Sequence, residues 1–132
     1  MSDARNVRAL RGATTVDAGT GADAATEATQ ELLRALLEQN GLTVDDVISA
    51  LFTVTPDLYS AHPARAARAA GWSEVPMLTA TEAPAEQSLP RCLRVLMHVE
   101  TPRPRSAMRH VYLHGARVLR PDLLDGDARG EH

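Results

Sequence analysis

Apolar side chains recur at two different spacings along this chain, and the two spacings predict different secondary structure. Residues 23–40 carry them every three or four positions, which predicts one long helix. Gly41 follows directly, and glycine is typical of the position just beyond a helix end. The predicted apolar stripe of this helix consists of Ala25, Ala28, Leu32, Ala35 and Leu36.

Alternating or continuous apolar stretches predict the strands. In residues 7–13, Arg11 shares one strand face with Val7 and Ala9, while Leu10 lies on the other face with Arg8. Proline residues end several of these stretches, because proline cannot donate to a strand ladder. By these criteria the predicted strands cover residues 7–13, 48–55, 76–81, 93–101 and 110–113.

Weaker signals describe the segments between these elements. Pro63 is expected to begin a second, short helix that ends at residue 70, before Gly71, since proline suits the first helical turn. Thr43 is expected to cap a short turn of helix. Residues 14–17 are expected to form a turn, and residues 81–90 a loop.

This order of elements predicts an α/β fold that forms a single domain over residues 1–132. A mixed β-sheet would carry one long and one short helix on one face. The other face would need cover, which an oligomer would supply. Residues 1–6 and about 124–132 are expected to be flexible tails, and the segment after the last strand is expected to be irregular.

Composition narrows the class of protein. A net charge of −3 gives no electrostatic case for binding nucleic acid or an anionic membrane. All 14 basic side chains are arginine, so Schiff-base chemistry on a lysine is excluded. No run approaches the ~18 apolar residues of a membrane span, and no signal peptide is evident. The single cysteine, Cys92, allows no internal disulfide and fits a reducing compartment, so we expect a cytoplasmic protein.

The most informative residue is Arg94, which interrupts the apolar run of residues 92–97. A guanidinium stays charged at ordinary pH, so its place in such a strand predicts an anionic partner. Arg11, Glu82 and Tyr112 provide matching groups elsewhere in the chain. Two cations, one carboxylate and one phenol would suit a small polyanion that bears a hydroxyl group.

Each of these groups also has a simpler interpretation. Arg11 would be an ordinary cation at a strand end, Glu82 a solvated residue at a loop entrance, and Tyr112 a core residue whose hydroxyl reaches water.

Arg94 shares its strand face with Glu100 and would then simply face water beside it. Arg65 and Arg68 lie three apart on the short helix, so they would either attract a dianion or only solvate that face. Cys92 is expected to be a buried, small apolar residue on the strand face opposite Arg94.

A metal site is not expected in this chain. His110 and His114 lie four residues apart, which is a metal-binding spacing only within a helix. The apolar and aromatic residues between them favour a strand instead.

Nine short segments, taken in chain order, carry a resemblance to a known family. They are Arg11-Gly-Ala-Thr-Thr, Ala50-Leu-Phe-Thr-Val-Thr-Pro-Asp-Leu, Pro63-Ala-Arg-Ala-Ala-Arg, Gly71-Trp, Val75-Pro, Glu82, Cys92-Leu-Arg-Val-Leu-Met, Arg109-His-Val-Tyr-Leu and Val118-Leu-Arg-Pro-Asp-Leu. Together they resemble the monofunctional α/β chorismate mutases of the AroH class, which isomerise chorismate to prephenate. Each segment is a weak signal alone, and their order makes the resemblance specific.

The resemblance implies a homotrimer, a pseudo-barrel with one active site in each cleft between neighbouring subunits, and no metal or organic cofactor. Arg11, Glu82, Arg94 and Tyr112 fall on the principal substrate-binding positions of the family. Further positions that line or approach the cleft correspond to Ala64, Arg65, Arg68, Met77, Leu78, Thr79, Leu119 and Arg120.

Some features depart from the family pattern. The segment before Gly71 is one residue shorter than in some relatives, His62 stands where relatives can carry an aromatic residue, and Thr79 stands where a relative can carry cysteine. Two other functions share parts of this description. A non-catalytic trimeric sensor of an anionic metabolite would use the same pocket, and a small trimeric imine or enamine deaminase would use a similar architecture.

Overall fold

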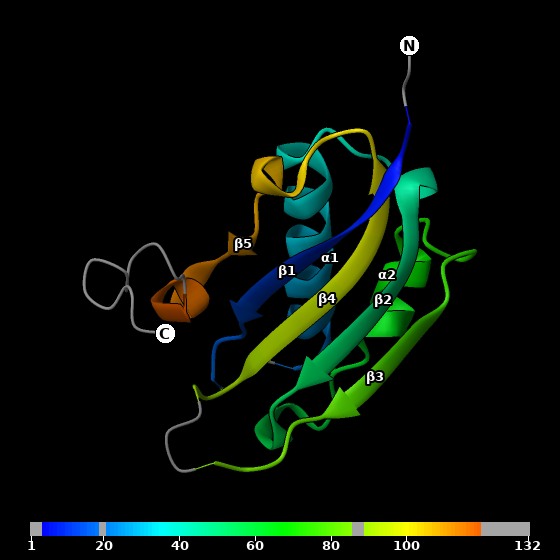
Figure 1. Ribbon diagram of the computed structural model, residues 1–132. Helices are drawn as coiled ribbons and strands as arrows, with labels where there is room; N and C mark the ends of the chain where they lie inside the picture. The colour runs from blue at the N-terminus through cyan, green and yellow to red at the C-terminus, as the bar shows by residue number, and fades with distance from the viewer. Residues whose placement is uncertain (1–3, 19–20, 86–88, 120–132) are drawn as a thin grey trace.

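The structure is a computed structural model that describes residues 4–18, 21–85 and 89–119. It contains a five-stranded mixed sheet with the strand order β3-β2-β4-β1-β5 (Figure 1). The central strand β4 pairs antiparallel with both β1 and β2, while β3 and β5 join the edges in parallel pairs. The strands are β1 (Asn6–Thr15), β2 (Val47–Val54), β3 (Met77–Thr81), β4 (Cys92–Thr101) and β5 (Val111–Tyr112).

Two helices, α1 (Ala22–Gln39) and α2 (Pro63–Ala69), cover one and the same face of the sheet (Figure 1). The side chain of Gln30 on α1 donates from Nε2 to the carbonyl oxygen of Ala66 on α2, at 3.0 Å. The predicted α/β fold with one long and one short helix on one face is therefore confirmed. Between the helices and the sheet lies the main core, to which β4 contributes Leu93, Val95, Met97 and Val99.

The apolar stripe predicted for α1 is close to the face that the helix buries. Of the five predicted positions, Ala25, Leu32 and Leu36 are buried, and the other two are half-buried at the margin. The helix ends where expected, because Gly41 adopts a φ of +64°, which favours glycine.

Gly12 allows α1 to approach β1 closely. A Cβ atom at this position would lie only 2.8 Å from Cδ1 of Leu36 and 3.1 Å from Cδ1 of Leu32. The glycine that follows Arg11 therefore lets α1 lie directly behind the part of β1 that carries this arginine.

Three predictions about segment ends are wrong. Thr14 and Thr15 continue β1 instead of forming a turn, since their partners Leu93 and Cys92 extend β4 equally far. The irregular segment predicted after residue 113 instead forms a short 3-10 helix, η4 (His114–Leu119), whose Ala116 is buried.

The third correction concerns the predicted N-terminal tail. Arg5 is not part of a loose segment, because its guanidinium binds the carboxylate of Asp46 and the carbonyl oxygen of Glu100. Asn6 already belongs to β1. The predicted C-terminal tail lies outside the described residues.

In the described part of the chain, the sheet face opposite the helices is open along one row of side chains. Arg11, Leu96, Leu51 and Leu78 form one row across four adjacent strands by their pairing register. The exposed fractions of the three leucines are 37% for Leu96, 40% for Leu51 and 72% for Leu78. A contiguous apolar row of this kind is typical of an interaction surface. In the described part of the chain, no helix is long and apolar enough to span a membrane.

Candidate active site

The second row on the open face contains Arg94. Its cross-strand partners are Ala13 on β1 and Thr53 on β2, so the guanidinium extends from the centre of the sheet between two small side chains. The Arg94 side chain is 38% exposed, and its Nε lies 3.1 Å from Oε2 of Glu82. Arg94 therefore does not simply face water beside Glu100.

Glu82 follows directly after β3, at the edge of the sheet. Its backbone amide donates to the carbonyl oxygen of Val54 at 2.8 Å, which continues the pairing between β2 and β3. Its carboxylate accepts a hydrogen bond of 2.6 Å from the hydroxyl of Thr53. These contacts turn the carboxylate back over the sheet toward Arg94.

A cavity of about 270 Å³ lies over this part of the sheet. The structure brings Arg11, Arg94, Tyr112 and Leu119, all predicted as site residues, to its wall, and Glu82 reaches it through Arg94. The remaining lining residues are Gly12, Ala13, Leu51, Thr53, Val95 and Leu96.

Two donors at this cavity lack hydrogen-bond partners. Among the described residues, neither Nε of Arg94 nor the hydroxyl of Tyr112 makes a hydrogen bond of good geometry, although both atoms are buried. The 3.1 Å approach of Arg94 to Glu82 is therefore an ion pair without good hydrogen-bond alignment. Because buried polar atoms normally find partners, two such donors at one cavity are a feature typical of a functional site.

The other predicted substrate-binding residues lie elsewhere. Ala64, Arg65, Arg68 and Thr79 line a separate hollow of about 130 Å³ between α2 and β3, together with Ala61 and His62. Met77 and Leu78 line a third hollow, beside Leu51 and Leu96 of the open face. Arg120 lies outside the described residues. The predicted substrate-binding residues thus form separate groups, one around Arg94 and others toward the β3 edge of the sheet.

The prediction that Cys92 faces away from Arg94 is wrong. Residues two apart in a strand share a face, and Cys92 packs with Ala13, Tyr112 and Ala116 beside the cavity. The prediction that it is buried is confirmed, since its exposed fraction is 0%. Burial raises the pKa of the thiol, while the nearby charge of Arg94 partly opposes this shift.

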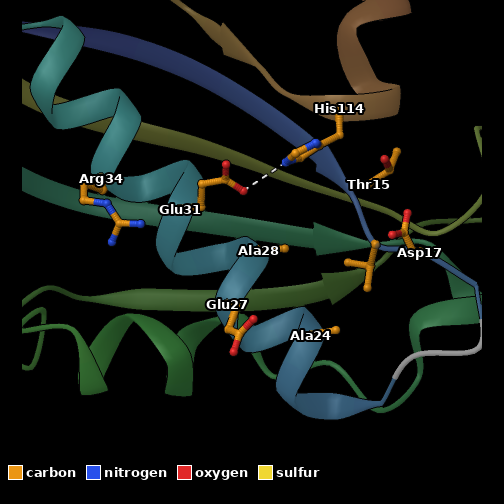
Figure 2. Close-up of a pocket in the computed structure, with 9 residues that line it drawn as sticks. Thr15, Asp17, Ala24, Glu27, Ala28, Glu31, Arg34 and His114 are labelled. Atoms are coloured by element: carbon orange, nitrogen blue, oxygen red, sulfur yellow. Dashed lines mark hydrogen bonds and ion pairs between the residues drawn. The ribbon is translucent and has the colours of Figure 1, made fainter.

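The two histidines considered for a metal site have different partners. Nδ1 of His110 accepts a hydrogen bond of 3.0 Å from the backbone amide of Arg11. His114 instead lies with Nε2 at 3.0 Å from Oε1 of Glu31 on α1, as Figure 2 shows. Within the described ranges, no three His, Cys, Asp or Glu side chains are grouped so that they could hold a metal ion.

A further hollow, of about 490 Å³, lies beside α1, and Figure 2 shows the residues that line it. None of the predicted site residues contributes to it, and its wall carries charged groups of both signs. The lining residues are Thr15, Val16, Asp17, Ala24, Glu27, Ala28, Glu31, Arg34 and His114.

Two residues that contact the predicted site residues were not predicted from the sequence. Thr53 belongs to one of the nine family-like segments, but nothing there indicated a role for it; its pairing register places it beside Arg94. His110 was considered only as a metal ligand, whereas its ring supports the backbone of Arg11. Only the pairing register would have found these two contacts in advance.

The contact between His110 and Arg11 should make the stability of the folded chain depend on pH. Partial burial of the ring against β1, and then the positive charge of Arg11, lower the pKa of His110 from its ordinary value of 6.5. The unfolded chain therefore takes up this proton more readily than the folded chain does. The contribution of uncharged His110 to the stability of the fold is therefore fully present above about pH 6.5 and is lost as the pH falls through the lowered pKa.

Replacing His110 with asparagine is expected to reduce this pH dependence. An asparagine oxygen can accept the Arg11 amide proton but does not titrate between pH 5 and 7.5. As the pH is lowered from 7.5 to 5, the melting temperature of the wild-type protein should fall more steeply than that of His110→Asn. Parallel melting curves for the two proteins would contradict the prediction.

The comparisons with known proteins agree in one family. A family profile described as "Chorismate mutase type I" matches residues 7–123. A curated relative, "Chorismate mutase AroH" of Thermus thermophilus, is 49% identical over 118 residues, which cover 89% of this chain and 96% of that protein. The "Chorismate mutase AroH" of Bacillus subtilis (strain 168) is 41% identical over 118 residues, or 89% of this chain and 92% of that protein.

A solved structure supports the same grouping. This chain is similar to a chorismate mutase from Clostridium thermocellum, with a TM-score of 0.80 and 47% sequence identity. The similarity covers 83% of this chain and 97% of the other.

Proposed function

The chain belongs to the type I chorismate mutase family and is a chorismate mutase, and we propose that its active site is the cavity around Arg94, completed by a neighbouring subunit. The enzyme is an isomerase of aromatic amino acid biosynthesis that converts chorismate to prephenate. The observation that carries the proposal is the pair of buried donors, Arg94 Nε and Tyr112 hydroxyl, left without hydrogen-bond partners at one cavity among the described residues.

The chemistry of the substrate explains why such a site suffices. Chorismate carries two carboxylates, an enolpyruvyl ether and a ring hydroxyl. Its rearrangement is intramolecular and pericyclic, since one C–O bond breaks while one C–C bond forms. No nucleophile or proton transfer is required of the protein. The enzyme has to select a compact conformer and stabilise the charge that develops on the ether oxygen.

Arg94 is suited to the ether oxygen. Its backbone is fixed at the centre of the sheet by pairing on both sides, and its side chain lines the cavity with Nε lacking a well-aligned hydrogen-bond partner. A preorganised donor of this kind stabilises developing negative charge most effectively. The planar fork of the guanidinium would be shared between the ether oxygen and a carboxylate of the substrate.

The other cavity residues would hold the remaining groups. Arg11 would bind the enolpyruvyl carboxylate, and the hydroxyl of Tyr112 would donate a further hydrogen bond to it. Glu82, when ionised, would accept a hydrogen bond from the ring hydroxyl and so fix the orientation of the ring. Leu119 would add an apolar wall.

The division of the predicted residues into separate hollows supports a site shared between subunits. The hollow that contains Arg65, Arg68 and Thr79 lies at the β3 edge, whereas the cavity around Arg94 extends toward β5. A cyclic assembly that buries the open sheet face would bring the hollow of one subunit to the cavity of the next. We propose a homotrimer, in which Ala64, Arg65, Arg68, Met77, Leu78, Thr79 and Arg120 complete the substrate site.

The proposal includes the cellular setting. The free thiol of Cys92 is buried and fits a reducing compartment, so we propose that the enzyme is cytoplasmic. We also propose that it needs no metal or organic cofactor, because a pericyclic rearrangement requires only positioning and charge stabilisation.

The direct test follows the ultraviolet absorbance of chorismate with purified protein, without added metal or cofactor. Rapid loss of absorbance with prephenate as the product is expected, and an Arg94→Ala variant should abolish it. Light scattering should give a mass of about 43 kDa, three times the 14.2 kDa of the chain. A folded trimer without turnover would contradict the assignment and favour a sensor of anionic metabolites. A monomer with full activity would contradict the shared site.

A further inference from the structure

Thr53 contacts the carboxylate of Glu82 at the wall of the cavity. Its hydroxyl donates to Oε2 of Glu82 at 2.6 Å, the same oxygen that lies 3.1 Å from Nε of Arg94. Thr53 lines the cavity and is the cross-strand partner of Arg94 on β2. The three side chains therefore meet at one carboxylate oxygen.

Glu82 depends on this contact more than a residue inside a strand would. It lies beyond the last residue of β3, and the residues that follow it, 83–85, are exposed. Its backbone amide donates a hydrogen bond to the carbonyl oxygen of Val54, but this hydrogen bond leaves the side-chain torsions free. In the described part of the chain, the only groups that hold its carboxylate are Thr53 and Arg94, and both act on Oε2.

The use of a single oxygen has a chemical consequence. With Oε2 held by Thr53 and Arg94, the other oxygen, Oε1, remains available to accept a hydrogen bond from a ligand. A freely rotating carboxylate would instead tend to form a paired, two-oxygen contact with the Arg94 guanidinium, because this geometry is favourable. Such a contact would leave neither Oε1 of Glu82 nor the N–H groups of Arg94 available to the substrate.

We propose that Thr53 is a positioning residue, whose hydroxyl holds Oε2 of Glu82 so that Oε1 meets the substrate hydroxyl and the Arg94 guanidinium stays free for the substrate. This inference rests on the roles proposed above for Glu82 and Arg94. Threonine suits the task because its β-branched side chain has few χ1 rotamers in a strand, so the hydroxyl keeps one direction.

The matched pair of variants is Thr53→Val and Thr53→Ser. Valine keeps the shape of threonine but removes the hydroxyl. Because the lost hydrogen bond is made to a charged carboxylate, kcat/KM should fall about 10- to 100-fold. Serine retains the hydroxyl and should stay within about threefold of wild type. Thr81→Val on the neighbouring strand β3, exposed and outside the cavity, is the control and should leave activity unchanged.

A double-mutant cycle separates positioning from a general structural effect. If Thr53 acts through Glu82, then Thr53→Val should cause less than about a twofold further loss in a Glu82→Gln background. Melting temperature and mass should stay those of the wild type in every variant. Full additivity of the two losses, or normal turnover by Thr53→Val, would overturn the inference.

The same cycle distinguishes this inference from the proposal on which it rests. Normal turnover by Glu82→Gln alone would show that the role proposed for Glu82 is wrong, and the inference about Thr53 would fail with it. A strong defect in Glu82→Gln combined with an unchanged Thr53→Val would overturn only the inference about Thr53.

Discussion

Replacing Arg94 with lysine is expected to lower kcat/KM for chorismate by about 10²- to 10³-fold, although the positive charge is kept. Lysine presents a point charge at the end of a flexible chain, whereas arginine presents a planar fork. Arg94 is held between Ala13 and Thr53 on the sheet, so the direction of its donors is set before the substrate binds. The loss should appear mainly in kcat, because the ether oxygen gains its charge in the transition state.

Steady-state kinetics on chorismate would measure this effect. Arg34→Lys is a matched control, since Arg34 is an exposed arginine of α1 in the hollow of Figure 2, away from the cavity. Its turnover should match that of the wild type. Near-normal kcat for Arg94→Lys would refute the role proposed for Arg94 and would point to a simple electrostatic effect of the cation.

Two inactive variants are expected to restore activity to each other when they assemble together. Arg94→Ala removes the cavity donor, and Arg68→Ala removes a cation from the hollow between α2 and β3. If each site combines the cavity of one subunit with the hollow of the next, some mixed trimers contain an unmutated site. Random assortment of equal amounts should then recover roughly a quarter of the wild-type activity.

The experiment needs joint refolding or coexpression, followed by a chorismate assay at equal total protein. The control mixes Arg94→Ala with Glu82→Ala, because both changes lie in the same cavity and no unmutated site can form. Recovery in the first mixture but not in the second would support the shared site. If the first mixture stayed inactive while each variant alone was a folded, inactive trimer, both residues would have to act within one subunit.

Much of the architecture was predictable from local patterns. The three- to four-residue spacing of α1 and the glycine at its end predicted a helix that the structure reproduces to within a residue. The apolar runs predicted all five strands of the described residues, because strands of a packed sheet carry apolar residues on at least one face. Segment ends were less predictable, since the extension of β1 through Thr15 depends on the length of its partner β4.

The candidate site was only partly predictable. Arg94 stood out because a charge inside an apolar strand needs a partner, and the order of segments identified the family. The contact of Thr53 with Glu82 had no such signal, because it depends on which strands pair and in which register. The support of Arg11 by the ring of His110 likewise joins residues 99 positions apart.

The sequence by itself thus determined the helices, the strands, the family and the residue types that a dianionic ether requires, because these follow from local spacing and from motifs in order. Only the tertiary structure decided which of those residues meet. It placed Arg94, Glu82 and Thr53 at one oxygen, set Cys92 on their side of the sheet, and left Arg65 and Arg68 at a separate hollow. The physical reason is that strand register and packing act between residues far apart in the chain, and no local pattern encodes them.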